Sequence, residues 1–146
     1  MLDTARSRVR ARPLPWLLRV ITAAALGVDA FVHADLVTRY DPNQGTAVIS
    51  QGGLFRIEAG VSALVALALI VSGRRVIWAL AVLVAASALG GILLYRYADP
   101  GAIGPLPDMY EPIWFPEKTL TAVAEAVATV TAVLGLLVTP RSGAGR

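Results

Sequence analysis

The sequence predicts an all-α integral membrane protein, a four-helix bundle that forms one domain over all 146 residues. Three observations predict this fold class. First, 56% of the residues are hydrophobic and only 16% are charged, which leaves too little polar surface for a water-soluble domain. Second, four stretches are apolar over the roughly 20 residues that a helix needs to cross the hydrocarbon of a bilayer. Third, the basic residues are distributed unevenly around these stretches, as in multi-pass membrane proteins.

The four predicted spans follow one another along the chain at about residues 14–36, 54–72, 76–95 and 119–138. We expect the first span to be retained rather than cleaved as a signal peptide, because its apolar run is long and contains Asp29 and His33. The Gly-Arg-Arg sequence at 73–75 predicts a tight turn between the second and third spans. Pro140 and the Gly- and Ser-containing residues after it end the fourth span.

The basic residues predict the orientation of these spans. Nine flank one side, namely Arg6, Arg8, Arg10, Arg12, Arg19, Arg74, Arg75, Arg141 and Arg146, and four flank the other, namely Arg39, Arg56, Arg96 and Lys118. Because positively charged flanks stay on the cytoplasmic side, we expect a multi-pass plasma-membrane protein with both termini in the cytoplasm. The pI near 9.8 follows from this asymmetry, so the expected partner is the lipid bilayer and not nucleic acid.

Small residues recur on the third and fourth spans and predict close packing between helices. They are Ala81, Ala85 and Ala88 on the third span and Ala122, Ala128 and Ala132 on the fourth. In membranes such residues let helix backbones approach one another. The same faces suit contact with another membrane protein or a second copy of the chain.

The longest connection, residues 97–117, is rich in proline and aromatic residues. Its five prolines prevent regular helix. In one interpretation it is a rigid connector, with Trp114 and Phe115 as an anchor at the membrane interface. In the other it is a lid that brings Asp108 or Glu111 to the mouth of a site between the helices.

Four ionisable side chains interrupt the apolar spans: Asp29 and His33 in the first, Glu58 in the second and Glu125 in the fourth. Asp29 and His33 are four residues apart and therefore share a helix face. The predicted orientation places all four toward the extracytoplasmic side. Because ionisable groups are costly in the hydrocarbon and mark functional sites, the pattern predicts one polar site between the helices.

Three carboxylates in an apolar half-bundle cannot all stay charged and unpaired, which leaves three alternatives. They can be protonated, they can pair with Arg56 and Arg96, or they can bind a cation. A histidine with two or three carboxylates suits zinc, manganese or iron, and the absence of cysteine excludes thiolate ligands. All four ionisable side chains are therefore candidate metal ligands. Glu58 also has a plainer interpretation, in which its carboxylate extends to the membrane interface.

The second and third spans resemble the DoxX-like family of small four-helix membrane proteins. The resemblance rests on Arg56-Ile57-Glu58-Ala59-Gly60, on an apolar run to Ser72-Gly73-Arg74-Arg75, and on the Ala-rich helix that follows. It implies a compact bundle, a family position for Glu58, and an association with respiratory or quinone-linked redox machinery. The polar first span and the proline-rich loop depart from the family pattern.

Three functions suit these features. The first is a non-enzymatic accessory or binding protein with a polar site between its helices. The second is a metal- or proton-binding protein linked to quinone redox chemistry. The third is a subunit of an oligomeric transporter, which is disfavoured because no span is broken by glycine or proline in its middle. An independent enzyme is not indicated, because no nucleophile and base stand out as a pair.

Overall fold

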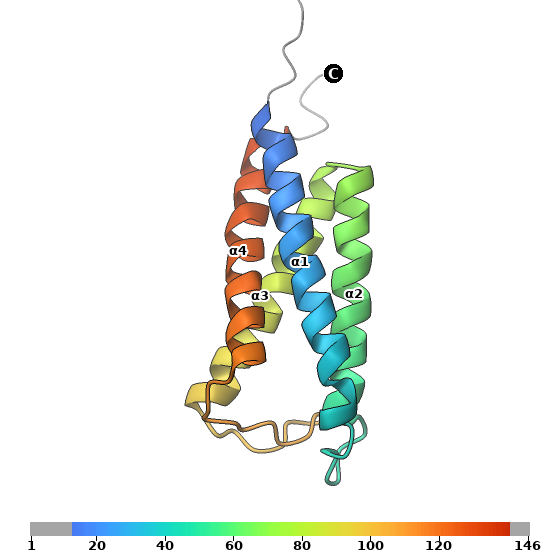
Figure 1. Cartoon of the computed structure of the whole chain (residues 1–146), viewed down its shortest axis with the longest axis vertical. Helices are drawn as coiled ribbons and strands as arrows, with labels where there is room; N and C mark the ends of the chain where they lie inside the picture. The colour runs from blue at the N-terminus through green and yellow to red at the C-terminus, as the bar shows by residue number, and fades with distance from the viewer. Residues whose placement is uncertain (1–12, 141–146) are drawn as a thin grey trace, which may run out of the picture.

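The computed structural model describes residues 13–140, and this part of the chain is all-α (Figure 1). Its helices are α1 (Pro13–Tyr40), α2 (Gln51–Val71), α3 (Arg75–Tyr97) and α4 (Pro116–Val138). Each helix is long and apolar enough to cross a membrane. The predicted all-α fold with four such helices is confirmed. Six of the arginines used to predict the orientation lie outside the described residues.

The helices begin and end at slightly different residues from those predicted, mainly on the side of the long loop. Helix α2 begins three residues early because Ser50 caps it, accepting a hydrogen bond from the backbone N–H of Gly53 at 3.0 Å. Helix α4 also begins three residues early, with Pro116 in its first turn, where a missing N–H costs nothing. Helix α1 continues to Tyr40, past the last apolar residue used to end the prediction.

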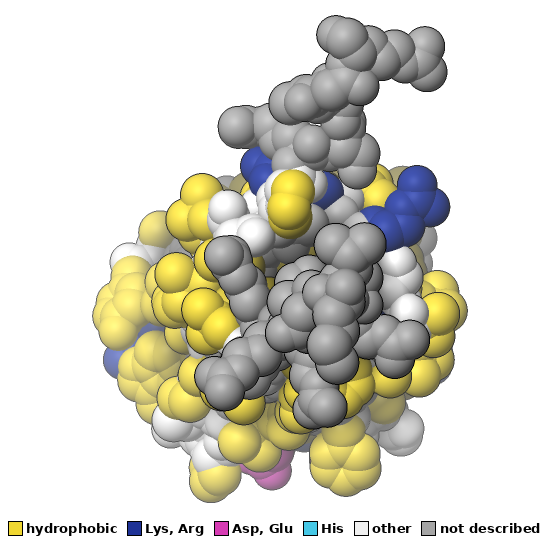
Figure 2. Space-filling model, turned by 90° about the horizontal axis from the view of Figure 1, so that it is seen from above, with side chains coloured by type: hydrophobic (Ala, Val, Ile, Leu, Met, Phe, Trp, Pro, Cys, Tyr) yellow, Lys and Arg dark blue, Asp and Glu magenta, His cyan; other side chains and the backbone are white. Residues whose placement is uncertain are grey.

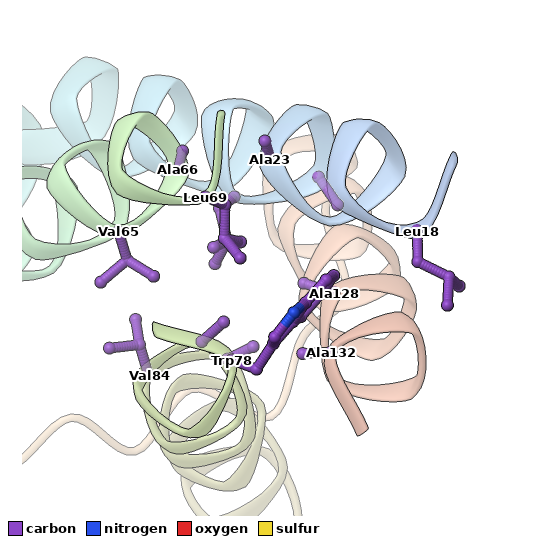
Figure 3. Packing of buried hydrophobic residues seen from close by; sticks show 13 residues of the cluster. Leu18, Ala23, Val65, Ala66, Leu69, Trp78, Val84, Ala128 and Ala132 are labelled. Atoms are coloured by element: carbon purple, nitrogen blue, oxygen red, sulfur yellow. The ribbon is translucent and has the colours of Figure 1, made fainter. Parts of the chain in front are cut away.

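The core lies between all four helices and is built mostly from small residues around one tryptophan (Figure 3). Trp78 on α3 is 1% exposed and lies beside Ala128 and Ala132 of α4. A Cβ added at Gly135 would overlap the Trp78 ring, so α4 approaches α3 only because this position has no side chain. The predicted packing through small residues is present here, since most of the alanines named above are buried.

The outer surface of the bundle is apolar around its circumference, as Figure 2 shows in the view along the helices. Large hydrophobic side chains point away from the core on all four helices; examples are Phe31, Leu64, Leu67, Leu83, Val130 and Leu137. A water-soluble monomer rarely exposes so continuous an apolar surface. A surface of this kind suits contact with lipid tails.

Two arginines fasten the end of the bundle where α1 begins and α4 ends, which we call the terminal end (Figure 1). Arg19 of α1 donates hydrogen bonds to the carbonyls of Leu69 and Ile70 in the last turn of α2, at 2.7 and 2.6 Å. Arg75 of α3 donates to the carbonyls of Leu136 and Thr139 at the end of α4, at 2.6 and 2.8 Å. These bonds satisfy carbonyls that have no partner within their own helix.

The opposite end, the loop end, carries the connections 41–50 and 98–115 (Figure 1). The two connections touch: Asn43 donates to the carbonyl of Asp108 at 3.0 Å, and the Ile49 N–H donates to the carbonyl of Pro105 at 3.3 Å. Helix α3 diverges from α2 toward this end, and residues 98–115 run across it. The contact between α2 and α3 is much less extensive than those of α1 with α2, α1 with α4 and α3 with α4.

Candidate functional site

Asp29 is the centre of a buried polar cluster between α1, α2 and α4. Its side chain is 1% exposed and accepts hydrogen bonds from Ser62 of α2 at 2.6 Å and from Thr121 of α4 at 2.8 Å. His33, one turn along α1, places its Nδ1 2.9 Å from Asp29 Oδ1. One carboxylate thus binds three helices together through hydroxyl and imidazole partners.

The two glutamates lie on either side of Asp29 and reach it through the same hydroxyls. Glu58 Oε1 is 3.0 Å from the Ser62 hydroxyl, and Glu125 Oε1 is 3.4 Å from the Thr121 hydroxyl. Glu125 is fully buried, and its second oxygen, Oε2, has no hydrogen-bond partner. The structure therefore brings all four of the predicted ionisable residues into one connected cluster.

The two arginines proposed as ion-pair partners of the cluster do not have that role in the structure. Arg56 instead forms an ion pair with Asp41, in which its two terminal nitrogens lie 3.0 and 2.8 Å from the two carboxylate oxygens. Its position one helical turn from the start of α2 directs it to the loop end, where Asp41 lies. This pairing, with a further hydrogen bond from Ser50, holds the pKa of Asp41 below its ordinary value. Arg96 lies over the rings of Tyr97 and Trp114 and forms no ion pair with the cluster.

A cavity of about 270 Å³ extends from the cluster toward the loop end. His33, Glu58 and Thr121 line its deep end. Its middle is apolar and receives side chains from α1, α2 and α3, namely Leu36, Leu54, Phe55, Ile57, Ala88 and Ile92. Gly91 also lines it, on the side where α3 diverges from α2. The cavity is therefore polar at its deep end and apolar along its length.

The loop 98–115 covers the other end of the cavity. Glu111 accepts a hydrogen bond from the Tyr40 hydroxyl at 2.8 Å, and its backbone N–H donates to the carbonyl of Tyr95 at 3.0 Å. Lys118 donates to the Glu111 carbonyl at 2.6 Å and lies 3.9 Å from its carboxylate. Met109 and Glu111 line the cavity. Glu111 thus lies where the lid interpretation expects it, whereas Asp108 binds Asn43 through its backbone and does not line the cavity.

Sequence reasoning missed Tyr40, Gln51 and Lys118, which line the mouth of the cavity. Tyr40 and Gln51 lay outside the predicted spans, and Lys118 was counted only as a flanking charge. Of these three residues, only Lys118 had a feature in the sequence that could have indicated a role in the site. It is the only lysine in the chain, and its side chain is buried at the start of an apolar helix.

The contact with Asp29 sets the chemistry of His33. Its Nδ1 lies near the Asp29 carboxylate and also 3.1 Å from the Asp29 carbonyl, which leaves Nε2 as the ring nitrogen available to another group. In the neutral ring with a proton on Nδ1, Nε2 is an acceptor; in the charged ring it is a donor. An aspartate that orients a histidine in this way is common where imidazole binds a ligand, a proton or a metal.

The chain matches none of the protein-family models, curated proteins or solved structures with which it was compared. The functional interpretation of the site therefore rests on its own geometry.

Proposed function

We propose that this chain is an integral membrane binding protein that holds a small amphipathic molecule in the cavity at its loop end. The observation that carries the proposal is the cavity itself. It is lined by residues of all four helices and the loop 98–115, its middle is apolar, and its polar groups gather at its two ends. Sites for small ligands combine an apolar lining with a few polar groups that fix orientation.

The expected ligand has an apolar ring or chain and one end that forms hydrogen bonds. The apolar part suits the region between Leu36, Phe55 and Ile92. The polar end suits His33 and Glu58, whose imidazole and carboxyl groups offer both donors and acceptors. A quinone of the kind associated with the DoxX-like family has these properties, as do other amphipathic ring compounds.

The direction of entry follows from the helix arrangement. Because α3 diverges from α2 at the loop end, a ligand dissolved in the bilayer can enter between these helices, beside Ile57 and Gly91. The excess of basic residues at the terminal end and in the segments beyond it supports an orientation with both termini cytoplasmic. In that orientation the cavity lies in the extracytoplasmic half of the membrane, where a partner protein or a second copy of the chain has access to the loop end.

Two neighbouring glycines allow a matched test. A Cβ at either Gly90 or Gly91 meets no atom within 4 Å, but Gly91 lines the cavity and Gly90 is exposed on the surface of α3. Both substitutions to leucine improve helix propensity equally. Gly91→Leu places an isobutyl group in the cavity, whereas Gly90→Leu places it outside.

The probe is 1-naphthol, an apolar ring system with one hydroxyl, offered to the full-length protein in lipid nanodiscs with EDTA present and empty nanodiscs subtracted. We expect saturable binding at one site in the wild type and in Gly90→Leu, and loss of that binding in Gly91→Leu. Equal binding by the two leucine variants would contradict the proposal, because the naphthol would then lie outside the cavity.

A further inference from the structure

We infer that Asp29, Glu125 and His33 form a binding site for one divalent cation of the first transition series, at the deep end of the cavity. This inference goes beyond the binding of an amphipathic ligand and does not depend on it. The three residues each offer one ligand atom, and these atoms lie within 4.8 Å of one another. His33 Nδ1 lies 2.9 Å from Asp29 Oδ1, and a cation bound by these two atoms would replace the proton that they share in its absence. Ligands that share one zinc ion at about 2.0 Å are separated by about 3.3 Å in a tetrahedral site, so small side-chain movements complete the arrangement.

The ionised cluster has a net charge of up to −2, which one divalent cation would neutralise. Asp29, Glu58 and Glu125 carry up to three negative charges, and His33 supplies at most one positive charge. In the described part of the chain, Arg and Lys form ion pairs only with carboxylates outside the cluster: Arg56 pairs with Asp41, and Lys118 lies beside Glu111. A divalent cation would supply two positive charges next to side chains that are almost completely buried.

The cluster also has too few hydrogen atoms to make all of its oxygen–oxygen contacts hydrogen bonds. Ser62 lies between Asp29 and Glu58, and Thr121 lies between Asp29 and Glu125. Each hydroxyl has one hydrogen and can donate to only one of its two carboxyl neighbours. Two oxygen–oxygen contacts therefore lack a hydrogen unless protons or a cation are added.

Glu125 Oε2 is the atom of the cluster that most lacks a partner. This oxygen is buried and accepts no hydrogen bond from any residue that the structure describes. An unpartnered buried oxygen is costly, and it requires an explanation in a side chain that is fully buried. A cation held by Asp29 and His33 would give Oε2 a partner.

The donor atoms indicate the class of the cation. One imidazole nitrogen with carboxylate oxygens suits manganese, iron or zinc, and the chain has no cysteine to select a softer ion. Ser62 and Thr121 would hold the carboxylate ligands in position from a second layer, as hydrogen-bonding neighbours do in known metal sites. The cation would reach the site through the cavity, because His33 and Thr121 line its deep end.

The test measures metal content directly. The full-length protein in detergent is treated with EDTA, dialysed separately against Mn²⁺ and Zn²⁺, passed over a desalting column and analysed by mass spectrometry for metal per chain. Glu125→Gln removes a ligand charge with little change in shape, and Glu117→Gln makes the same change on the same helix outside the cluster. We expect one equivalent of at least one of the two metals in the wild type and in Glu117→Gln, and at least about tenfold weaker binding in Glu125→Gln.

Wild-type protein that retains neither metal would overturn the inference and would leave protons as the charges that neutralise the cluster. Equal retention by Glu125→Gln and the wild type would also overturn it, because the metal would then lie elsewhere. The wild-type result needs no variant to fold, and size-exclusion chromatography verifies the folding of both variants. The naphthol experiment is performed in EDTA, so its outcome is independent of this one.

Discussion

Replacing Thr121 by valine removes one hydroxyl from the buried cluster and keeps the shape of the side chain. Thr121 is 3% exposed and donates a hydrogen bond to Asp29 at 2.8 Å. The free energy lost by this change depends on whether Asp29 is ionised. A hydrogen bond to a charged group contributes about 1.5–3 kcal/mol to stability, whereas a neutral side-chain bond between membrane helices contributes on average about 0.6 kcal/mol.

Thr131 provides the matched control on the same helix. Its hydroxyl accepts a hydrogen bond from Thr22 of α1 at 2.7 Å, and both partners are neutral. Thr131→Val therefore removes one neutral bond between the same two helices. If Asp29 is an anion, we expect Thr121→Val to lower the free energy of unfolding by about 1.5–3 kcal/mol and Thr131→Val to lower it by only about 0.6 kcal/mol.

The assay is reversible unfolding in mixed micelles of increasing SDS content, followed by tryptophan fluorescence. Trp78 is buried in the core, so its emission reports the separation of the helices. A loss in Thr121→Val no larger than that in Thr131→Val would refute the reasoning, because Asp29 would then behave as a neutral group. A cluster of neutral carboxyl groups would also remove the charge argument for a cation.

Two further predictions concern the core and the loop end. Gly135→Ala forces a Cβ into the Trp78 ring, so we expect net destabilisation of up to about 2 kcal/mol, from about 1–3 kcal/mol of overpacking less about 1 kcal/mol of helix propensity. Gly90→Ala, which meets no atom within 4 Å, should instead gain up to about 1 kcal/mol, and equal effects in SDS unfolding would show that α3 and α4 do not pack so closely. The pKa of Asp41 is lowered by Arg56, so their ion pair stabilises the fold above the ordinary aspartate pKa of 3.8 and is lost as the pH falls through the lowered value. The melting temperature of the wild type should therefore exceed that of Asp41→Asn at neutral pH and low salt and converge with it in acid; a constant difference would contradict the assignment.

The sequence was sufficient to predict the four helices, because the apolar content of each span exceeds what a soluble helix of that length requires. It predicted the helix ends less well. Ser50 and Pro116 lie outside the apolar runs, yet they determine where α2 and α4 begin by capping and by fixing the backbone. Hydropathy detects the membrane-crossing part of a helix, and these residues lie beyond it.

The members of the polar cluster were also predictable, because each is an ionisable group in an otherwise apolar helix. Their partners were not. Arg56 is two residues from Glu58 in sequence, but successive helix positions face different directions, and Arg56 meets Asp41 instead. The cavity was not predictable either, because it results from the divergence of α3 from α2 and from the path of the loop 98–115. Neither property is encoded in the composition of a single span.

The arginine contacts at the terminal end determine which end of the bundle can open. Arg19 and Arg75 each connect the final turn of one helix to a different helix, with charged hydrogen bonds directed at the negative end of the helix dipole. Among the residues that the structure describes, no hydrogen bond or ion pair joins α2 to α3 near Ile57 and Gly91. Thermal motion should therefore pivot α3 about Arg75 and widen the loop end, so that exchange with the surrounding lipid occurs sideways between α2 and α3 while the terminal end stays closed.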